Sequence, residues 1–235
     1  VTATDPDGTA QNLSFTLSSG PDKALFAIDA STGVLSFLTA PDYEAPLDAN
    51  GDNIYEVVVQ VADGTGAVDR QTIAVTVTPV NETPPTITSS ATASVAENTT
   101  TVSTVTASDP DRPAATLSYR VAGGADAALF AIDASTGALS FITAPDFDTP
   151  LDAGGDNVYD VTVEVTDGDF SSSQAIAVTV TPVNETPPTI TSSATAAVAE
   201  NTTAVLTLTA TDPDRPAASL SYRLAGGADA ALFAI

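Results

Sequence analysis

Acidic residues recur in pairs, separated by one residue, at regular intervals along the chain. The pair in Asp5-Pro6-Asp7 returns in Asp109-Pro110-Asp111 and again in Asp212-Pro213-Asp214. Two carboxylates at this spacing, in a tight turn or an extended segment, can face the same ion. Ca²⁺ takes about six to eight oxygen ligands from carboxylates, Asn side chains and loop carbonyls, whereas Mg²⁺ retains more water. The pairs therefore predict a divalent-cation site, and calcium is the ion that suits them best.

Four other acidic motifs recur together with these pairs. They are a Glu-Asn pair, a second acidic pair separated by one residue, an Asp-Gly pair after an alternating run, and an Asn-Glu pair before two prolines. Their acidic and amide members are Glu97 and Glu200; Asp42, Glu44, Asp146 and Asp148; Asp63 and Asp167; and Asn81, Glu82, Asn184 and Glu185. Turn formation on a solvated surface explains any one motif as well as metal binding does. Recurrence of all five in the same order favours metal binding.

A period of about 103 residues organises these motifs. Residues 80–85 return as residues 183–188, and a fixed period of this size is typical of an array of small domains. Paired prolines stiffen a connection and remove backbone donors, so they belong between domains. We therefore predict repeats at 1–83, 84–186 and 187–235. The first is expected to lack its first strand, the second to be complete, and the third to hold only initial strands, as in a window cut from a longer array.

The apolar residues alternate with polar ones, which is the pattern of half-buried β-strands. The runs with this alternation are 55–61, 73–77, 117–121, 159–165 and 176–180. Residues 29–33 are predicted to form a turn between two short strands, with Gly33 at positive φ. Several short strands per repeat, without a sustained helical period, predict an all-β fold in which each repeat is a two-sheet sandwich.

The net charge of −24, from 30 acidic and 6 basic residues, restricts the partners of the chain. Nucleic acids and anionic membranes are excluded, because their phosphates bind Lys and Arg. Disorder is excluded as well, because 43% of the residues are hydrophobic and they alternate regularly. The acidity is best explained by a multivalent cation.

The chain contains no Cys and no His. Disulfides, thiol redox chemistry and zinc sites built from His or Cys are therefore excluded. No apolar stretch approaches the roughly 18–20 residues of a membrane span. An enzyme is not expected, because no nucleophile with a base is available and a catalytic acid pair would not recur in every repeat.

Taken together, the motifs resemble cadherin repeats. The series runs Glu-Asn, Asp-x-Asp, Phe-x-Ile-Asp-x-x-x-Gly-x-Leu, Asp-x-Glu, Asp-Gly and an Asn-Glu linker, and it covers the whole chain. Residues 48–55 are similar to the bacterial cadherin-like variety. The resemblance implies an elongated array of tandem Ig-like Greek-key β-sandwiches, with Ca²⁺ as the cofactor at each junction between repeats.

The resemblance also implies which repeat supplies which ligand. The first junction would join Asp42, Glu44, Asn81 and Glu82 with Asp109, Asp111 and Asp167. The second would join Glu97, Asp146, Asp148, Asn184 and Glu185 with Asp212 and Asp214. Asp5, Asp7 and Asp63 would serve a preceding junction, and Glu200 a following one.

Several positions depart from the family pattern. Pro79 and Thr83 flank the first Asn-Glu pair, where the family usually has acidic or amide residues. Glu82 stands in place of a shorter Asp, and Asp148 in place of a longer Glu. Because of these two exchanges, the two junctions are expected to differ in the number or affinity of their ions. The Glu that begins a repeat is missing from the first junction only because the window begins too late to include it.

One further acidic stretch allows two interpretations. Asp48, Asn50 and Asp52 have a spacing that could suit an additional ion, but the second repeat has Gly154 at the middle position. A turn is therefore favoured over an additional site.

The leading functional hypothesis is a calcium-stiffened segment of an extracellular or cell-surface adhesin. The alternative is a structural subunit of an extracellular filament or sheath formed by polymerising repeats. Sugar binding is weakly indicated, because there is no Trp and only 6% of the residues are aromatic. The expected partners are calcium ions, neighbouring repeats of the same chain, and other copies of the chain or a cell-surface ligand. Contact with nucleic acid or membrane is not expected.

Overall fold

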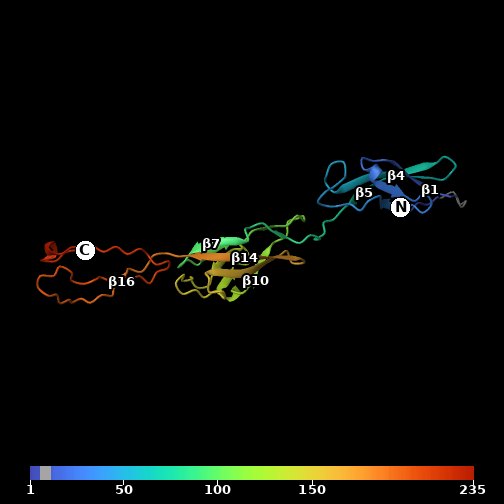
Figure 1. Cartoon of the computed structure of the whole chain (residues 1–235). Coiled ribbons are helices and arrows are strands. Elements are labelled where there is room, and N and C mark those ends of the chain that lie inside the picture. Colours follow the sequence, from blue (N-terminus) through green and yellow to red (C-terminus); the bar gives the residue numbers. More distant parts are fainter. Residues whose placement is uncertain (6–11) are drawn as a thin grey trace. The chain divides into compact units, whose positions relative to one another are not determined.

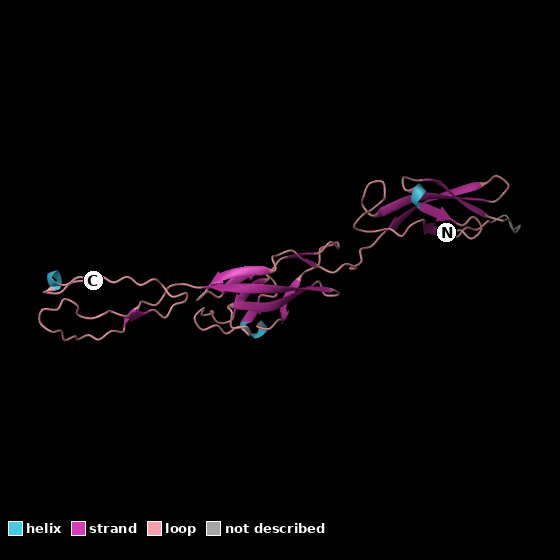
Figure 2. Cartoon of the chain, in the orientation of Figure 1, coloured by secondary structure: helices cyan, strands magenta, loops and turns pink. Residues whose placement is uncertain are grey.

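The computed structural model describes residues 1–5 and 12–235, so Asp7 lies outside the described residues. Strands and loops make up these residues, and the helical ones are confined to short 3₁₀ turns (Figure 1, Figure 2). The chain forms two compact units, Val1–Pro84 with Asp109–Thr116, and Pro85–Ser108 with Leu117–Ile235. Within the described ranges, no helix has the length and apolar character needed to cross a membrane.

The first unit contains two antiparallel sheets. Its elements are β1 (Ser14–Ser19), η1 (Lys23–Leu25), β2 (Phe26–Ile28), β3 (Leu35–Phe37), β4 (Ile54–Ala62) and β5 (Val68–Thr76). One sheet has the order β1-β4-β5, and the other pairs β2 with β3. Phe26, Tyr55 and Val57 are buried between them, and the Phe26 ring stacks on Phe37 with centroids 4.6 Å apart. The predicted strand at 55–61 is thus confirmed as β4.

The second unit contains a complete sandwich. Its strands are β6 (Thr86–Ile87), β7 (Thr92–Ala96), β8 (Thr101–Thr104), β9 (Ala107–Ser108), β10 (Ser118–Gly123), β11 (Phe130–Ile132), β12 (Ala138–Phe141), β13 (Val158–Thr166) and β14 (Ser171–Thr181), with η2 at Ala127–Leu129. One sheet has the order β10-β13-β14-β7 and the other β11-β12-β8, while β6 pairs with β9. The two larger sheets form the seven-stranded, two-layer architecture of Greek-key sandwiches. The predicted fold class is confirmed.

The alternation of buried and exposed side chains along β13 shows which face of this strand lines the core. Tyr159, Val161, Val163 and Val165 are at most 1% exposed, while Asp160 between them is exposed. Successive side chains of a strand point to opposite faces, so this one strand supplies the core on one side and polar groups on the other.

The turn between β11 and β12 is built by its own side chains. The Asp133 carboxylate accepts N–H groups from Ser135 and Thr136, 3.0 and 2.8 Å away, and Gly137 closes the turn at φ 70°. These hydrogen bonds, led by that of Thr136, lower the pKa of Asp133 to about 2. The first repeat repeats this geometry with Gly33 at φ 67°, as the sequence predicted.

Residues 187–235 form only β15 (Thr189–Ile190), β16 (Ala210–Thr211) and the 3₁₀ turn η3 (Ala230–Leu232). In the complete sandwich β7 pairs in parallel with β14, which buries Val95 to 9% exposure. Val198 occupies the same place in the repeat but is 52% exposed. Val198 lies outside any strand, so no neighbouring strand covers its apolar side chain.

Candidate metal centre

Two groups of three carboxylates lie in the second unit. Glu97, Asp146 and Asp148 have ligand atoms within 4.8 Å of one another, and so do Asp148, Glu185 and Asp214. Asp148 belongs to both groups, so together they form one continuous acidic cluster, which we call the second cluster. Five of the residues predicted for the second junction are therefore brought together.

Glu97 connects three segments of this cluster. It follows β7 directly and is 3% exposed. Its Oε2 accepts the N–H of Phe147 at 2.7 Å, and its Oε1 accepts the N–H of Val183 at 2.6 Å. One buried carboxylate thus holds both the Asp-x-Asp loop and the segment that leads to Asn184 and Glu185.

The Asp146-Phe147-Asp148 loop is held by hydrogen bonds to Asp146. The Oδ1 atom of Asp146 accepts the N–H groups of Asp148 and Thr149, at 2.8 and 3.1 Å. The Thr149 hydroxyl donates to Oδ2 of the same carboxylate, and this bond is the main cause that lowers the pKa of Asp146. Asp146 is therefore ionised at neutral pH.

The Asp212-Pro213-Asp214 motif holds the linker. Asp214 is 4% exposed, and its Oδ2 accepts the N–H groups of Glu185 and Thr186, both at 3.0 Å. Oδ1 of Asp212 accepts the N–H of Asp214 at 3.1 Å. Asn184 is exposed beside Glu185. The motif thus brings its own carboxylates to the Asn-Glu pair.

The second cluster carries negative charge that its neighbours do not balance. Burial, together with the carboxylates of Glu97, Asp214 and Asp148, raises the pKa of Glu185, although the Asn98 side chain donates a hydrogen bond to it. Oδ1 of Asp148 and Oδ1 of Asp214 are buried without a hydrogen-bond partner among the described residues. Oxygen atoms left in this state suit a hard cation such as Ca²⁺.

The first unit repeats part of this arrangement. Oδ2 of Asp111 accepts the N–H groups of Glu82 and Thr83, at 2.9 and 3.0 Å, and Asp109 accepts the N–H of Asp111 at 2.9 Å. Oδ2 of Asp109 is buried and has no hydrogen-bond partner among the described residues. We call these residues, with the Asp42-Tyr43-Glu44 loop and Asn81, the first cluster.

The Asp42-Tyr43-Glu44 loop reaches the Asp-Pro-Asp segment through a backbone contact. The N–H of Arg112 donates to Oε1 of Glu44 at 3.0 Å, and Asp42 accepts the N–H of Glu44 at 2.9 Å. Within residues 1–5 and 12–235, however, the first unit contains no group of three close carboxylates. With a period of about 103 residues, the position equivalent to Glu97 falls before residue 1.

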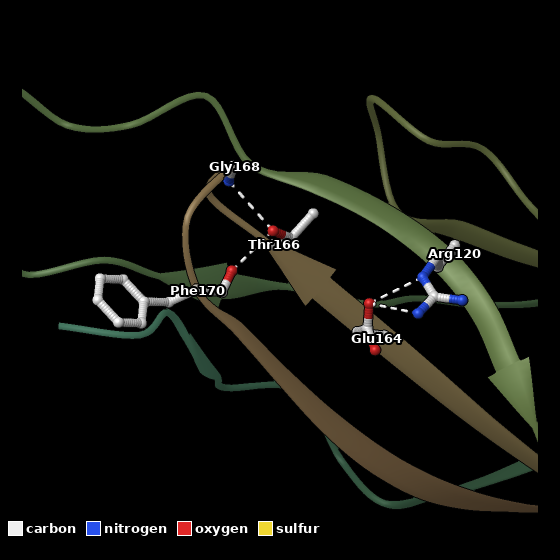
Figure 3. Close-up of polar contacts among 5 residues, drawn as sticks. All are labelled: Arg120, Glu164, Thr166, Gly168 and Phe170. Atoms are coloured by element: carbon white, nitrogen blue, oxygen red, sulfur yellow. Dashed lines mark hydrogen bonds and ion pairs between the residues drawn. The ribbon is translucent and has the colours of Figure 1, made fainter. Parts of the chain in front are cut away.

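Asp167, which was predicted for the first junction, lies in the hairpin loop between β13 and β14. Figure 3 shows that Thr166 closes this loop: its hydroxyl donates to the Phe170 carbonyl at 2.6 Å and accepts the Gly168 N–H at 3.1 Å. On the neighbouring strands Arg120 pairs with Glu164 at 2.7 Å. Asp167 belongs to the second unit and Asp109 and Asp111 to the first, so their shared role stays a prediction.

The remaining predicted ligands are spread over both units. Asp5 and Asp63 line one cavity of about 310 Å³ in the first unit, and hydrogen bonds led by the N–H of Thr65 lower the pKa of Asp63. Glu200 is exposed and belongs to neither group of three.

Sequence reasoning did not assign roles to Asn98 and Thr149, although both contact the second cluster. Asn98 adopts φ 62° and reaches Glu185 at 3.3 Å. The recurrence of the Glu-Asn pair was the available signal for Asn98. No sequence signal marked Thr149, because the first repeat has Ala45 at the corresponding place.

A Cadherin domain family model matches residues 1–78 and 91–182. Protocadherin-16 of Mus musculus is 32% identical over 252 residues, which span all of this chain and 7% of that protein. Protocadherin Fat 4 of Mus musculus is 29% identical over 241 residues, 95% of the chain and 5% of that protein. The chain thus spans less than a tenth of the length of these two relatives.

Solved cadherin structures share the fold. Mouse Cadherin-23 EC22-24 has a TM-score of 0.63 at 22% identity, with 90% of this chain and 68% of that chain covered. Human CDH23 EC21-23 has a TM-score of 0.64 at 19% identity, with 87% and 69% covered. Because the family model matches well over half of the residues, the chain belongs to the cadherin family.

Proposed function

We propose that this chain is a calcium-binding, calcium-rigidified extracellular segment of a cell-surface adhesion protein. The observation that carries the proposal is the second cluster, in which two groups of three carboxylates share Asp148. Cadherin domains bind calcium in general, and the family's ectodomains are extracellular or at the cell surface. Members of the family are adhesion proteins, not enzymes.

The proposed calcium ligands are those predicted from the sequence. In the second cluster they are Glu97, Asp146, Asp148, Asn184, Glu185, Asp212 and Asp214. In the first cluster they are Asp42, Glu44, Asn81, Glu82, Asp109 and Asp111, with Asp167 as a further ligand. Asp5, Asp7 and Asp63 would serve a preceding junction and Glu200 a following one. The repeat boundaries 1–83, 84–186 and 187–235 are part of the same proposal.

The repulsion between clustered carboxylates explains how calcium would stiffen the chain. Without a cation the clustered carboxylates repel one another, which favours separation of the segments that carry them. Calcium would supply the positive charge that holds the Asp146-Phe147-Asp148 loop, the Asn184-Glu185 linker and the Asp-Pro-Asp motif together. Affinities of extracellular calcium modules are on the order of 10⁻⁴–10⁻³ M, so such sites would fill over this range of calcium concentration.

A calcium titration of the whole chain tests the proposal. Isothermal titration calorimetry should detect calcium binding with Kd on the order of 10⁻⁴–10⁻³ M, and the melting temperature should rise with calcium. Magnesium should bind more weakly. Absence of calcium-dependent heat and of any change in melting temperature at 10-fold excess over the expected Kd would overturn the proposal.

A filament subunit is the second candidate. It is supported by the recurrence of the same motifs at a period of about 103 residues, because like repeats can also associate between chains. Sedimentation velocity in calcium separates the two functions. An adhesion segment stays at a fixed small size as concentration rises, whereas a filament subunit forms growing ordered polymers.

A further inference from the structure

The first two repeats each contain a second polar network next to the Asp-x-Glu or Asp-x-Asp loop. In the second repeat it consists of Asp126, Asp152 and Asn157, which are 5%, 7% and 9% exposed. The equivalent residues of the first repeat are Asp22, Asp48 and Asn53, at 4%, 7% and 9%. None of these six residues belongs to the proposed calcium ligands.

Both carboxylates of this network accept hydrogen bonds from backbone N–H groups. Asp126 accepts the N–H groups of Ala153 and Asp160, both at 2.7 Å. Asp152 accepts the N–H groups of Asp156 and Asn157, at 2.9 and 3.1 Å. Burial opposes ionisation of Asp152, but these backbone hydrogen bonds lower its pKa overall. The loop from Asp152 to Asn157 is therefore a turn fixed by carboxylates that need no metal ion.

Asn157 connects this turn to the Asp146-Phe147-Asp148 loop. It sits at φ 62°, with its N–H held by Asp152, and its carbonyl accepts the N–H of Val180 at 2.9 Å. Its side-chain Nδ2 donates to the carbonyl of Phe147 at 3.0 Å. The side-chain Oδ1 has no hydrogen-bond partner among the described residues, so this amide acts on the loop through its Nδ2 donor.

Phe147 is thereby held at both ends of its backbone. Glu97 accepts its N–H at 2.7 Å, and Asn157 donates to its carbonyl at 3.0 Å. Because Phe147 lies between Asp146 and Asp148, holding its two polar groups constrains the backbone from which both neighbouring carboxylates project.

The first repeat has the same contacts on a different sequence. Nδ2 of Asn53 donates to the carbonyl of Tyr43 at 3.0 Å, and the Asn53 carbonyl accepts the N–H of Val77 at 3.0 Å. Tyr43 replaces Phe147, and Asn50 replaces Gly154. Asn53 thus holds the Asp42-Tyr43-Glu44 loop in the same way as Asn157 holds the loop of the second repeat.

We propose that Asn157 and Asn53 are positioning residues, which orient the Asp146-Phe147-Asp148 and Asp42-Tyr43-Glu44 loops for calcium before the ion binds. This inference rests on the proposed calcium-binding function. Groups that orient metal ligands typically change metal affinity by about 10–100-fold when they are removed. Binding to loops that are already ordered avoids the entropy of ordering them in the complex.

Asn157→Gly in the whole chain is the test. Glycine tolerates φ 62° without strain, so the substitution removes the side-chain donor and leaves the backbone conformation accessible. We expect calcium affinity at the second cluster to fall about 10-fold by calorimetry. In chelator, the amide of Asp148 should exchange hydrogen faster, while amides in the middle of β13 keep wild-type rates.

Two further variants make the comparison specific. Asn157→Asp keeps the shape of the side chain but lacks the Nδ2 donor, so it should not restore the calcium affinity. Asn50→Gly is the matched control: it removes an exposed Asn whose counterpart is already Gly154, and it should bind calcium like wild type. Should Asn157→Gly fail to fold, Asn53→Gly tests the same contact in the other unit.

The outcomes separate this inference from the proposed function. Wild-type calcium affinity in a folded Asn157→Gly or Asn53→Gly protein would overturn the inference. So would a lower melting temperature in chelator without any change in calcium affinity, because that result describes a structural role only. Failure of the wild-type chain itself to bind calcium would instead overturn the proposed function, and the inference with it.

Discussion

The first and second acidic clusters share their motifs but differ in how their carboxylates converge. In both, an Asp-Pro-Asp motif accepts two N–H groups of the linker through one carboxylate oxygen. Only the second cluster contains close groups of three carboxylates among the described residues. In the second cluster the buried Glu97 holds Phe147 and Val183 at once. The recurring motifs thus supply the ligands, and this buried acid gathers them in the second cluster.

Asp148→Asn should have the largest effect on this comparison. Asp148 belongs to both groups of three, so its loss removes a charge and a ligand from each. We expect calcium affinity at the second cluster to fall by more than about 100-fold, beyond the usual effect of a residue outside the ligand shell. Calorimetry of the chain measures this. Asp160→Asn, the same change at an exposed site on β13, is the control, and equal losses in both would refute the assignment of Asp148.

Glu97→Gln should loosen the second cluster. The neutral side chain can accept only one of the two N–H groups that Glu97 now accepts, and the other is left buried without its partner. The expected cost in chelator is about 1–3 kcal/mol of unfolding free energy, measured by urea denaturation.

Calcium affinity at the second cluster should also fall. If Glu97→Gln kept the wild-type affinity, the proposed role of Glu97 in gathering the ligands of this cluster would be refuted.

Val178→Ala and Val75→Ala compare the two sandwiches themselves. Val178 pairs with Tyr159 and is fully buried, whereas Val75 pairs with Tyr55 and is half-buried. Removing two methyl-sized groups from a filled core should cost about 2–3 kcal/mol at Val178, and about half of that at Val75. Denaturation monitored separately in each unit would show this ratio, and equal costs would mean that the two cores are equally packed.

The sequence was sufficient for the parts of this molecule that depend on local pattern. Alternation located β4 and β13, and the Asp-x-x-x-Gly spacing located the turn that ends at Gly137. The recurring acids pointed to the five carboxylates that lie together in the second cluster. Asp48 also forms a turn, in which its carboxylate accepts the N–H groups of Asp52 and Asn53, as the sequence favoured.

The buried contacts between distant segments were not accessible from the sequence. Asp126 accepts the N–H of Asp160, 34 residues away, and Glu97 accepts that of Val183, 86 residues away. Such pairs depend on which strands become neighbours, and a polar residue in a turn looks the same in sequence whether it is exposed or buried. Asn157 was therefore indistinguishable from an ordinary turn residue.

The smallest expected effect concerns a feature that both repeats share. The folded pKa of Asp133, about 2, lies below the usual value of 3.8. Its contribution to stability is therefore present above pH 3.8 and is lost as the pH falls toward 2. Asp133→Asn should lower stability by a constant amount at neutral pH, and the difference from wild type should shrink through this window. The same should hold for Asp29, whose pKa is also lowered by the hydrogen bonds of its turn. A difference that stays constant down to pH 2 would contradict the role of the ionised carboxylate.

The most direct test of the account is small-angle X-ray scattering of the whole chain in calcium, in chelator, and in magnesium. The account predicts a long particle with a narrow distribution of dimensions in calcium. Chelation should broaden that distribution, and calcium should restore it more completely than magnesium does. Identical scattering in calcium and in chelator would contradict the central claim, because the acidic clusters would then have no effect on the stiffness of the chain.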